Sequence, residues 1–544
     1  MIREWIEEAA ARQGGTPYLE DAAGGGTLTY AGLRRRTQAW AQYLEHAGIA
    51  PGARVAVRIG DPLEYATALV AILGAGRVAV PLDPAAPAAE VDRLLAVARP
   101  EAVITASDQR LERLEGCQEA ERGSGADGAG GIFLCTSGTT GTPKGIALHE
   151  DQLAHVAAAV AGHHRLTPAD RGYCCLPLFH VNAEVVGLLA TLAARACLVL
   201  DGKFSRRGFW PLIAGRQITW INAVPAIITV LAMDPPAERV SGRIRFVRSA
   251  SAPLPPATLR RFEDAFGIPV VETYGMTEAA SMITANPVDG PRKAGSAGRP
   301  AGTQVRVAER AGPQYLPCRA GTVGRVQIRG RGVIREYAAG GPAGAIDAGG
   351  WLDTGDLGHL DEDGYLFLAG RSDDVINRGG EKIYPREIED FLIAQPGVCS
   401  AVVVAARDEV LGERPVAYVI PAESRQWAEL AESLREACQA ALPRPKRPTE
   451  FCLVRELPLG PTGKVARRRL RELAAAPASG RRGRGAAGED VYQVEAEDVL
   501  VVLVDQLPAG ADGEVVLAQR PTPATIMLDR SAGTARPGPA LGRR

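Results

Sequence analysis

The residue string with the most evident chemistry runs from Thr136 to Gly145 and reads Thr-Ser-Gly-Thr-Thr-Gly-Thr-Pro-Lys-Gly. Hydroxyl groups and the backbone N–H groups of a glycine-rich loop can surround a polyphosphate, and the Lys144 ammonium adds positive charge. A Walker A loop is excluded, because that motif needs Gly-Lys-Ser/Thr, whereas here Pro143 precedes Lys144 and Gly145 follows it. A flexible polar turn is the alternative, which so long and specific a string disfavours. The sequence therefore predicts a phosphate-binding loop.

Other strings combine glycines with charged or aromatic residues. They are Leu73-Gly-Ala-Gly-Arg-Val-Ala-Val-Pro-Leu-Asp-Pro84, Glu272-Thr-Tyr-Gly-Met-Thr-Glu278, Trp351-Leu-Asp-Thr-Gly-Asp356 with Gly370-Arg371, Asn377-Arg-Gly-Gly-Glu-Lys-Ile-Tyr-Pro385 and Leu457-Pro-Leu-Gly-Pro-Thr-Gly-Lys464. With the loop, these strings resemble the adenylate-forming superfamily of acyl- and aryl-CoA synthetases, peptide-synthetase adenylation domains and luciferases. The resemblance covers about Thr27 to Glu472 in the family's order, and the chain looks most similar to stand-alone acyl- or aryl-CoA ligases.

The resemblance implies a site for ATP and AMP. The residues that it assigns to the nucleotide are Thr136, Ser137, Gly138, Thr139, Thr140, Gly141, Ser251, Ala252, Thr273, Tyr274, Gly275, Met276, Thr277, Asp356 and Arg371. Tyr274 offers an aromatic face for adenine, and the Asp356 carboxylate suits both ribose hydroxyls, with Arg371 donating nearby. A buried tyrosine in a strand–turn and an Asx turn at Asp356 are the alternatives.

The resemblance assigns catalytic roles to Lys464, Glu278 and Lys144. Lys464 follows a Pro-Thr-Gly turn, from which its ammonium can offset the charge that builds as a carboxylate attacks the α-phosphate. A solvated lysine is the alternative, and it loses weight because lysines are scarce in this arginine-rich chain. Glu278 and Thr140 are expected to hold Mg²⁺, which takes one or two carboxylates plus substrate phosphates.

The expected acid pocket comprises His180, Val181, Asn182, Asn222 and Ser249. Peptide-synthetase adenylation domains place an aspartate near this first segment to hold an amino group, and its absence here disfavours an α-amino acid. The segments look most like those of small-acid, oxalate-type and aryl-acid relatives, and fatty chains are less favoured. A purely structural histidine is an equal alternative for His180.

These assignments predict that the enzyme converts an organic acid into an acyl-AMP, releases pyrophosphate and passes the acyl group to a thiol. CoA is the first expected acceptor, a separate carrier protein the second and an amine the third, and an unusual oxyacid such as nitrite stays open as substrate. Gly379 and Gly380 would let a pantetheine arm pass close to the backbone, and Asp373 matches the family's hinge. A degenerate scaffold without catalysis is disfavoured, because Lys464 and Glu278 are both present.

The elements that must position these residues alternate between strand-like and helix-like runs from Thr27 to about Leu200, which predicts βαβ units. We expect an α/β fold, with a large N-terminal domain of layered α/β sheets plus a β-rich subdomain, and a small mobile α+β C-terminal domain. The expected boundaries are 1–371 for the large ATP- and acid-binding domain, 372–473 for the small domain, 474–490 for a linker, 491–530 for an extra segment of unknown role and 531–544 for a disordered tail.

Composition narrows the partners. The 544 residues carry a formal net charge of −1, which gives no general attraction to nucleic acid or an anionic membrane. No uncharged apolar run reaches the ~20 residues of a membrane span. The nine cysteines form no C-x-x-C pair, so a reducing cytoplasm is expected. The extra segment leaves docking or a homodimer open.

Overall fold

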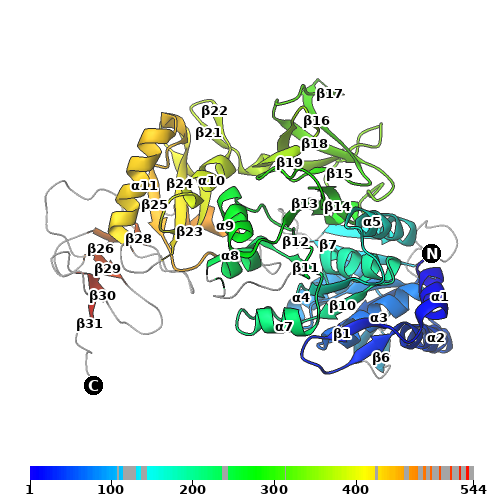
Figure 1. The fold of residues 1–544 in the computed structure, drawn as a ribbon. Coiled ribbons are helices and arrows are strands. Elements are labelled where there is room, and N and C mark those ends of the chain that lie inside the picture. Colours follow the sequence, from blue (N-terminus) through cyan, green and yellow to red (C-terminus); the bar gives the residue numbers. More distant parts are fainter. Residues whose placement is uncertain are drawn as a thin grey trace, which may run out of the picture. The chain divides into compact units, whose positions relative to one another are not determined.

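The structure, a computed structural model, describes residues 1–106, 110–113, 130–136, 144–233, 235, 243–312, 314–422, 427–458 and 465–475, together with short strands between 482 and 537. The chain divides into two compact units (Figure 1), Met1–Thr354 with Gly358–Leu368 and Gly355–Leu357 with Ala369–Arg544. Each unit has hydrophobic clusters of its own. The expected α/β fold with a large N-terminal and a small C-terminal domain is confirmed.

The first unit contains a nine-stranded sheet whose middle strands are parallel. Its strands, in spatial order, are β15 (Arg299–Pro300), β14 (Ser281–Ala285), β13 (Val270–Met276), β12 (Phe246–Ser249), β11 (Trp220–Ala223), β9 (Arg171–Cys174), β10 (Cys197–Leu200), β1 (Pro17–Asp21) and β2 (Thr27–Thr29). Strands buried on both faces are typical of parallel sheets, which helices cover on each side. The sheet is thus the main support for loops at its strand ends.

A six-stranded sheet carries the predicted phosphate loop. Its strands, in spatial order, are β6 (Arg110–Arg113), β5 (Ala102–Ala106), β3 (Arg54–Val57), β4 (Val78–Pro81), β7 (Gly131–Thr136) and β8 (Lys144–His149). β7 and β8 are antiparallel neighbours, and Thr136 pairs with Lys144. The loop is therefore the connection of a hairpin, and its two ends are held side by side.

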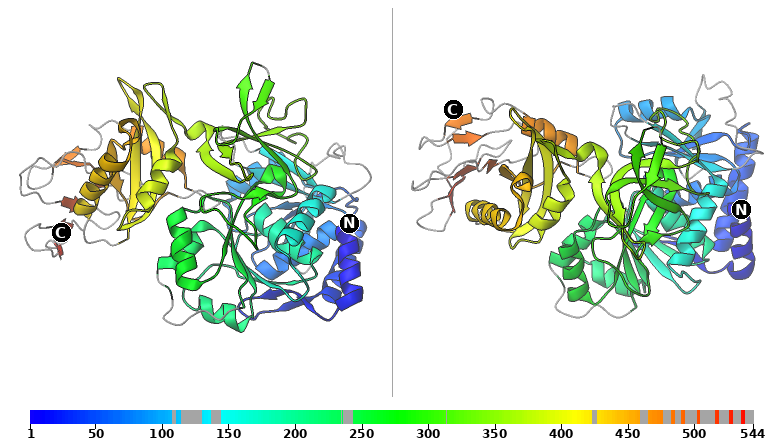
Figure 2. Two further views of the ribbon diagram at one scale, coloured as in Figure 1. Left: turned by 45° about the horizontal axis from the view of Figure 1, so that its top comes forward. Right: turned by 90° about the horizontal axis from the view of Figure 1, so that it is seen from above.

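Helices cover both faces of the nine-stranded sheet. One face packs on α7 (Phe209–Gly215), α8 (Pro225–Met233) and α9 (Pro256–Phe266), drawn in green in Figures 1 and 2. The other face contributes to the largest core with helices of the N-terminal half. The remaining helices of this unit are α1 (Ile2–Gln13), α2 (Tyr30–His46), α3 (Pro62–Gly74), α4 (Ala88–Ala98), α5 (Glu150–His163), the π-helix η2 (Asn182–Leu189), α6 (Ala190–Ala193) and the 3₁₀ turn η3 (Thr277–Ala279).

A five-stranded sheet with antiparallel neighbours follows. The short strands and glycine turns beyond Gly302 predict such a β-rich subdomain. Its order is β17 (Gln314–Pro317), β16 (Gln304–Ala311), β18 (Gly324–Arg329), β19 (Leu352–Leu360) and β20 (Leu366–Arg371). The middle of β19, Gly355–Leu357, and the end of β20, Ala369–Arg371, belong to the second unit.

The second unit is an α+β body. Its elements are η4 (Ser372–Asp374), β21 (Ile376–Arg378), β22 (Glu381–Ile383), α10 (Pro385–Ile393), β23 (Val398–Asp408), β24 (Gly412–Pro421), α11 (Trp427–Ala441), η5 (Arg444–Lys446), β25 (Glu450–Leu453), α12 (Arg467–Ala475) and the short strands β26 (Arg482–Arg484), β27 (Asp490–Tyr492), β28 (Val502–Leu503), β29 (Val515–Leu517), β30 (Ile526–Leu528) and β31 (Ala535–Pro537). Apolar residues of α10 and α11 pack on β23, β24 and β25 (Figure 2). No helix in the described ranges has the length and apolarity that a membrane crossing requires.

Candidate active site

Several predicted site residues lie outside the described part of the chain. They are Ser137, Gly138, Thr139, Thr140, Gly141 and Lys464. Their roles stay predictions. The two ends of the loop, Thr136 and Lys144, are placed by the hairpin of β7 and β8.

One side chain, Tyr337, connects the predicted catalytic residues Lys144 and Glu278. The Lys144 ammonium lies 5.6 Å from the centroid of the Tyr337 ring. The Tyr337 hydroxyl in turn donates a hydrogen bond of 3.1 Å to Glu278 Oε1. Tyr337 is thus a bridge that the sequence analysis missed. A tyrosine three residues after the apolar pair Val333-Ile334 gave no signal of a role beyond packing.

Backbone hydrogen bonds hold this bridge in place. The Gly145 N–H donates to Ala339 O over 2.9 Å, and the Ala338 N–H donates to Gly145 O over the same distance. The Ile334 N–H donates to Glu278 O over 2.8 Å. The segment that carries Tyr337 is therefore tied on one side to β8 and on the other to Glu278.

The chain around Glu278 reverses sharply. β13 carries Thr273, Tyr274, Gly275 and Met276, with a bulge between Tyr274 and Gly275, and Thr277 opens η3. A Cβ on Gly275 would lie 1.7 Å from Ser281 O, so only glycine fits there. Ala280 and Ser281 follow with positive φ values of 50° and 106°. Bulges and strained residues concentrate at functional sites, and this turn holds both.

Two predicted acid-pocket residues form a buried polar cluster with an arginine. Asn222 lies on β11 and is paired in register with Arg248 on β12. Arg248 Nη1 donates to Asn182 Oδ1 over 2.7 Å and to Asn222 Oδ1 over 3.0 Å. Asn182 Nδ2 donates to Ser251 Oγ over 3.2 Å. The structure thus brings together Asn182, Asn222 and Ser251, and it adds Arg248.

Arg248 is the second residue that the sequence analysis missed. Its side chain is 2% exposed, and burial lowers its pKa to about 9. Within the described ranges no carboxylate forms an ion pair with it. An arginine inside the strand-like run Phe246-Val-Arg-Ser is the signal that could have pointed to it, since buried charges are rare without a partner.

The other expected acid-pocket residues flank this cluster. His180 and Val181 precede η2, and the His180 carbonyl accepts bonds from the N–H groups of Ala183 and Glu184. The buried Ser249 hydroxyl has no hydrogen-bond partner among the described atoms. Ser249 O accepts a bond of 3.1 Å from Thr273 Oγ1. Acid-pocket and nucleotide residues therefore meet at the carboxyl ends of β12 and β13, where ligands of parallel sheets bind.

Ser251 and Ala252 follow β12 and are exposed. Ser251 has a φ of 72°, which is uncommon for a residue with a side chain. Its hydroxyl is turned to Asn182, as described above. Residues in such a strained conformation concentrate at functional sites.

The predicted ribose pair lies in the second unit. Arg371 Nη1 donates to Asp356 Oδ1 over 3.2 Å, so the two residues are neighbours as the resemblance implies. Gly355, within β19, has a φ of 76°, and a Cβ there would lie 2.9 Å from Arg371 Nη2. The arginine can therefore lie close over the backbone beside Asp356.

The expected hinge residue Asp373 lies in η4. Arg471 on α12 donates to the Asp373 carbonyl over 2.9 Å and pairs with the neighbouring Asp374 carboxylate. Gly379 and Gly380 form the turn between β21 and β22 with φ values of 60° and 90°. Two-residue hairpins of this kind need positive φ at both positions, so the glycines have a structural reason to be there besides the expected thiol tunnel.

Comparisons with known proteins agree with these motifs. The model of the AMP-binding enzyme family matches residues 6–128 and 132–338, and that of the AMP-binding enzyme C-terminal domain matches 387–464. A sulfoacetate–CoA ligase of Cupriavidus necator is 37% identical over 86% of this chain and 96% of its own. An oxalate–CoA ligase of Arabidopsis thaliana is 34% identical over 81% of this chain and 92% of its own.

Solved structures have the same architecture. ATP-bound MatB from Rhodopseudomonas palustris superimposes with a TM-score of 0.76 at 28% identity, over 87% of this chain and 99% of MatB. The o-succinylbenzoate CoA synthetase MenE from Bacillus subtilis, in complex with the acyl-adenylate intermediate OSB-AMP, gives 0.73 at 27% identity, over 86% of this chain and 97% of MenE.

Proposed function

This chain belongs to the AMP-binding enzyme family, and from its site we propose that it joins a small organic acid to CoA through an acyl-AMP. The predicted superfamily is confirmed, and acid–CoA ligase activity is what its relatives support. The observation that carries the proposal is the contact chain from Lys144 through Tyr337 to Glu278. It places a cation and a carboxylate of the predicted ATP site around one aromatic ring.

In the proposed first step, the acid's carboxylate attacks the α-phosphate of ATP, an acyl-AMP forms and pyrophosphate leaves. Lys144 would bind phosphate oxygens, and Lys464 would offset the negative charge that develops at the reacting oxygens. Asp356 and Arg371 would bind the ribose. Tyr274 would contact the adenine.

Mg²⁺ is proposed to assist at Glu278, together with Thr140. Glu278 is 8% exposed, and no group of three or more His, Cys, Asp or Glu within the described ranges could hold a metal without other ligands. A single carboxylate fits Mg²⁺, which takes its other ligands from substrate phosphates and water. The ion, when bound, neutralises charge on the phosphates.

In the second step, the CoA thiol would attack the acyl-AMP carbonyl, form the thioester and release AMP. Gly379 and Gly380 remain the proposed passage for the pantetheine arm. A carrier-protein thiol and an amine are the competing acceptors. A small acid is favoured because buried polar side chains gather beside Ser251, and because the relatives include ligases for sulfoacetate and oxalate.

The compartment and assembly state are also proposals. No cysteine within the described ranges forms a disulfide, which suits a reducing cytoplasm. We also propose a homodimer, which the molecular mass in solution would test, and a biosynthetic role.

The test is ATP–pyrophosphate exchange over a panel of short mono- and dicarboxylic, sulfonic and aryl acids, with and without CoA. We expect exchange with at least one short acid without CoA, and an acyl-CoA product when CoA is added. If a product forms with an amine or a carrier protein but not with CoA, the acceptor is that nucleophile and not CoA. The absence of exchange with every acid would overturn the proposal.

A further inference from the structure

Arg248 is a buried cation in an apolar setting. Register pairing aligns it with Cys174, Asn222 and Val271 across the sheet. Trp220 and Phe246, two positions from Asn222 and Arg248 on their strands, belong to the largest hydrophobic core on that face. A guanidinium in such a place costs considerable free energy unless hydrogen bonds or an anion compensate it.

The described residues compensate this guanidinium only in part. Both of its hydrogen bonds leave from Nη1, toward the side-chain oxygens of Asn182 and Asn222. The Nε atom is buried and has no acceptor. A guanidinium has five N–H donors and binds a carboxylate or sulfonate through two of them at once. The Nε side of the Arg248 guanidinium therefore has hydrogen-bonding capacity that no described residue uses.

The neighbouring His163 and His164 do not supply that anion. An imidazole is either neutral or positively charged, and burial, with Arg248 as a further cause, lowers the pKa of both side chains. Neither histidine can therefore supply negative charge to Arg248.

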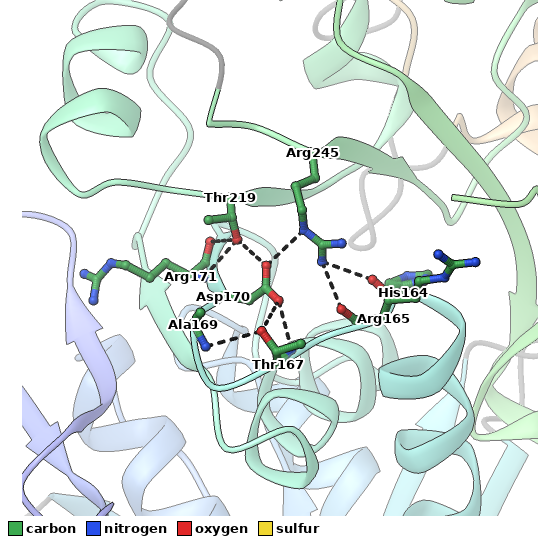
Figure 3. A network of polar contacts seen from close by, with 8 residues as sticks. All are labelled: His164, Arg165, Thr167, Ala169, Asp170, Arg171, Thr219 and Arg245. Carbon is green, nitrogen blue, oxygen red and sulfur yellow. Dashed lines mark hydrogen bonds and ion pairs between the residues drawn. The ribbon is translucent and has the colours of Figure 1, made fainter. Parts of the chain in front are cut away.

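Arg245, three residues earlier, shows what a structurally satisfied arginine looks like in this protein. Its guanidinium pairs with Asp170 at 3.0 Å and donates to the carbonyl oxygens of His164 and Arg165 (Figure 3). Asp170 is itself fixed by Thr167 and Thr219. Arg245 therefore has a carboxylate partner within the described residues, whereas Arg248 has none.

The place of Arg248 limits the size of its anion. Asn182 contacts both Arg248 and Ser251, and Ser251 is one of the residues that the resemblance assigns to the nucleotide, whose α-phosphate the acid attacks. One side chain therefore separates the guanidinium from Ser251. A molecule that reaches both has only a few atoms between its two ends.

η2 supports the same conclusion. Asn182 begins this π-helix, a rare element that is found mostly at functional sites. Its Nδ2 donates to Ser251 Oγ, and its Oδ1 accepts from Arg248 Nη1. Asn182 therefore contacts both ends of the inferred site.

We propose that Arg248, positioned by Asn182 and Asn222, binds a second anionic group of the substrate, so that the enzyme acts on short acids with a carboxylate or sulfonate at the far end. This inference rests on the proposed acid activation and names its substrate class. The first carboxylate reacts with ATP, whereas the second stays bound to Arg248 and does not react.

The experiment compares each dicarboxylate with its own half-amide, namely oxalate with oxamate and malonate with malonamate, in ATP–pyrophosphate exchange. The pairs have nearly the same shape and differ in the second charge. We expect the wild type to favour one of the dicarboxylates by about 100-fold in kcat/KM, since a desolvated charge pair is strongly favourable. This comparison needs no variant, so it holds even if a substitution impairs folding.

Arg248→Met tests the residue, and Arg245→Gln is the matched control. Arg248→Met should lower kcat/KM for the favoured dicarboxylate by about 100-fold and change that of the half-amide by less than about threefold. Arg245→Gln should leave the ratio between the two acids unchanged. Equal losses for both acids in Arg248→Met would overturn the assignment.

The two proposals fail differently. Exchange with monocarboxylic acids and no preference for a second charge would overturn the Arg248 site and leave the proposed function standing. Absence of exchange with any acid would overturn the proposed function and this site with it.

Discussion

At the scale of single residues, Tyr337 is the side chain that connects Lys144, at the end of the predicted phosphate loop, with the predicted metal ligand Glu278. Tyr337→Phe keeps the ring next to Lys144 and removes the hydrogen bond to Glu278. We expect kcat to fall about tenfold, because a hydrogen bond to a charged group is lost. The Mg²⁺ concentration for half-maximal exchange should rise, because Glu278 loses the contact that orients it.

Tyr315→Phe is the control for this change. Tyr315 also donates to a carboxylate, Asp353, over 3.3 Å, but on the five-stranded sheet. Its exchange rate and Mg²⁺ requirement should match those of the wild type. The same Mg²⁺ curve for both variants would show that Tyr337 only packs.

Lys464 lies outside the described residues, so its predicted role is tested by kinetics. Lys464→Ala should lower the exchange rate by about 10²- to 10³-fold, as expected for loss of a group that stabilises transition-state charge. ATP affinity, measured by calorimetry, should change little. Lys446→Ala is the matched control, because Lys446 pairs with Glu387 at 2.7 Å. Wild-type exchange in Lys464→Ala would contradict the assignment.

At the scale of elements, η2 contains an unusual carboxyl group. Glu184 is fully buried, and neither of its oxygens has a hydrogen-bond partner among the described residues. Burial raises its pKa well above the ordinary value. The native protein therefore holds a proton there after the unfolded chain has lost it, and stability declines as the pH rises above the ordinary glutamate pKa of about 4.3.

Glu184→Gln removes that titration. The unfolding free energy of the variant relative to wild type should increase with pH, by at most about 1.4 kcal/mol per unit at 25 °C, until the raised native pKa is passed. Thermal unfolding at about pH 5 and about pH 8 measures it. Glu309→Gln, an exposed change on β16, should show no such trend. A difference between Glu184→Gln and wild type that is the same at both pH values would contradict a buried neutral carboxyl.

Gly380, in the turn between β21 and β22, has two competing explanations: the positive φ of the turn and the expected passage for the pantetheine arm. Gly380 has a φ of 90° and no atom near the position of a Cβ. Asparagine tolerates positive φ, so Gly380→Asn keeps the turn while it adds a side chain. If the turn carries the pantetheine arm, thioester formation should fall about tenfold and exchange should change little.

Gly321→Asn, at a φ of 80° in the other unit, controls for the cost of the substitution itself. Equal loss of both half-reactions in Gly380→Asn would remove the tunnel and leave the turn as the reason for the glycine.

The elements show what a sequence can reveal. Alternating apolar runs predicted β3, α3 and β4, because strand and helix periods are local properties. The family resemblance assigned Asn182, Asn222 and Ser249 to one pocket, and the structure brings Asn182 and Asn222 into contact. Arg248 and Tyr337 were not predicted, because their significance comes from tertiary contacts. Arg248 is a buried strand residue that contacts Asn182, and Tyr337 connects segments that lie far apart in the sequence.

At the scale of the whole molecule, the chain divides into two compact units, and the predicted hinge residue Asp373 belongs to the second. It lies in η4, close to where the second unit begins at Ala369. The family resemblance implies that the small unit rotates about this residue between the two half-reactions. Such a rotation depends on a few backbone dihedral angles.

Asp373→Pro fixes φ near −65° and removes an N–H, so it should hinder that rotation. Exchange needs only the adenylating arrangement, whereas turnover to thioester needs both. We therefore expect exchange within about threefold of wild type and thioester formation lowered by more than about tenfold, since a conformational step then limits the cycle. Asp373→Ala keeps φ free and should retain both activities. A proline variant that loses both half-reactions to the same extent, or an alanine variant that behaves like it, would show that Asp373 acts through its side chain or through folding and not as a hinge.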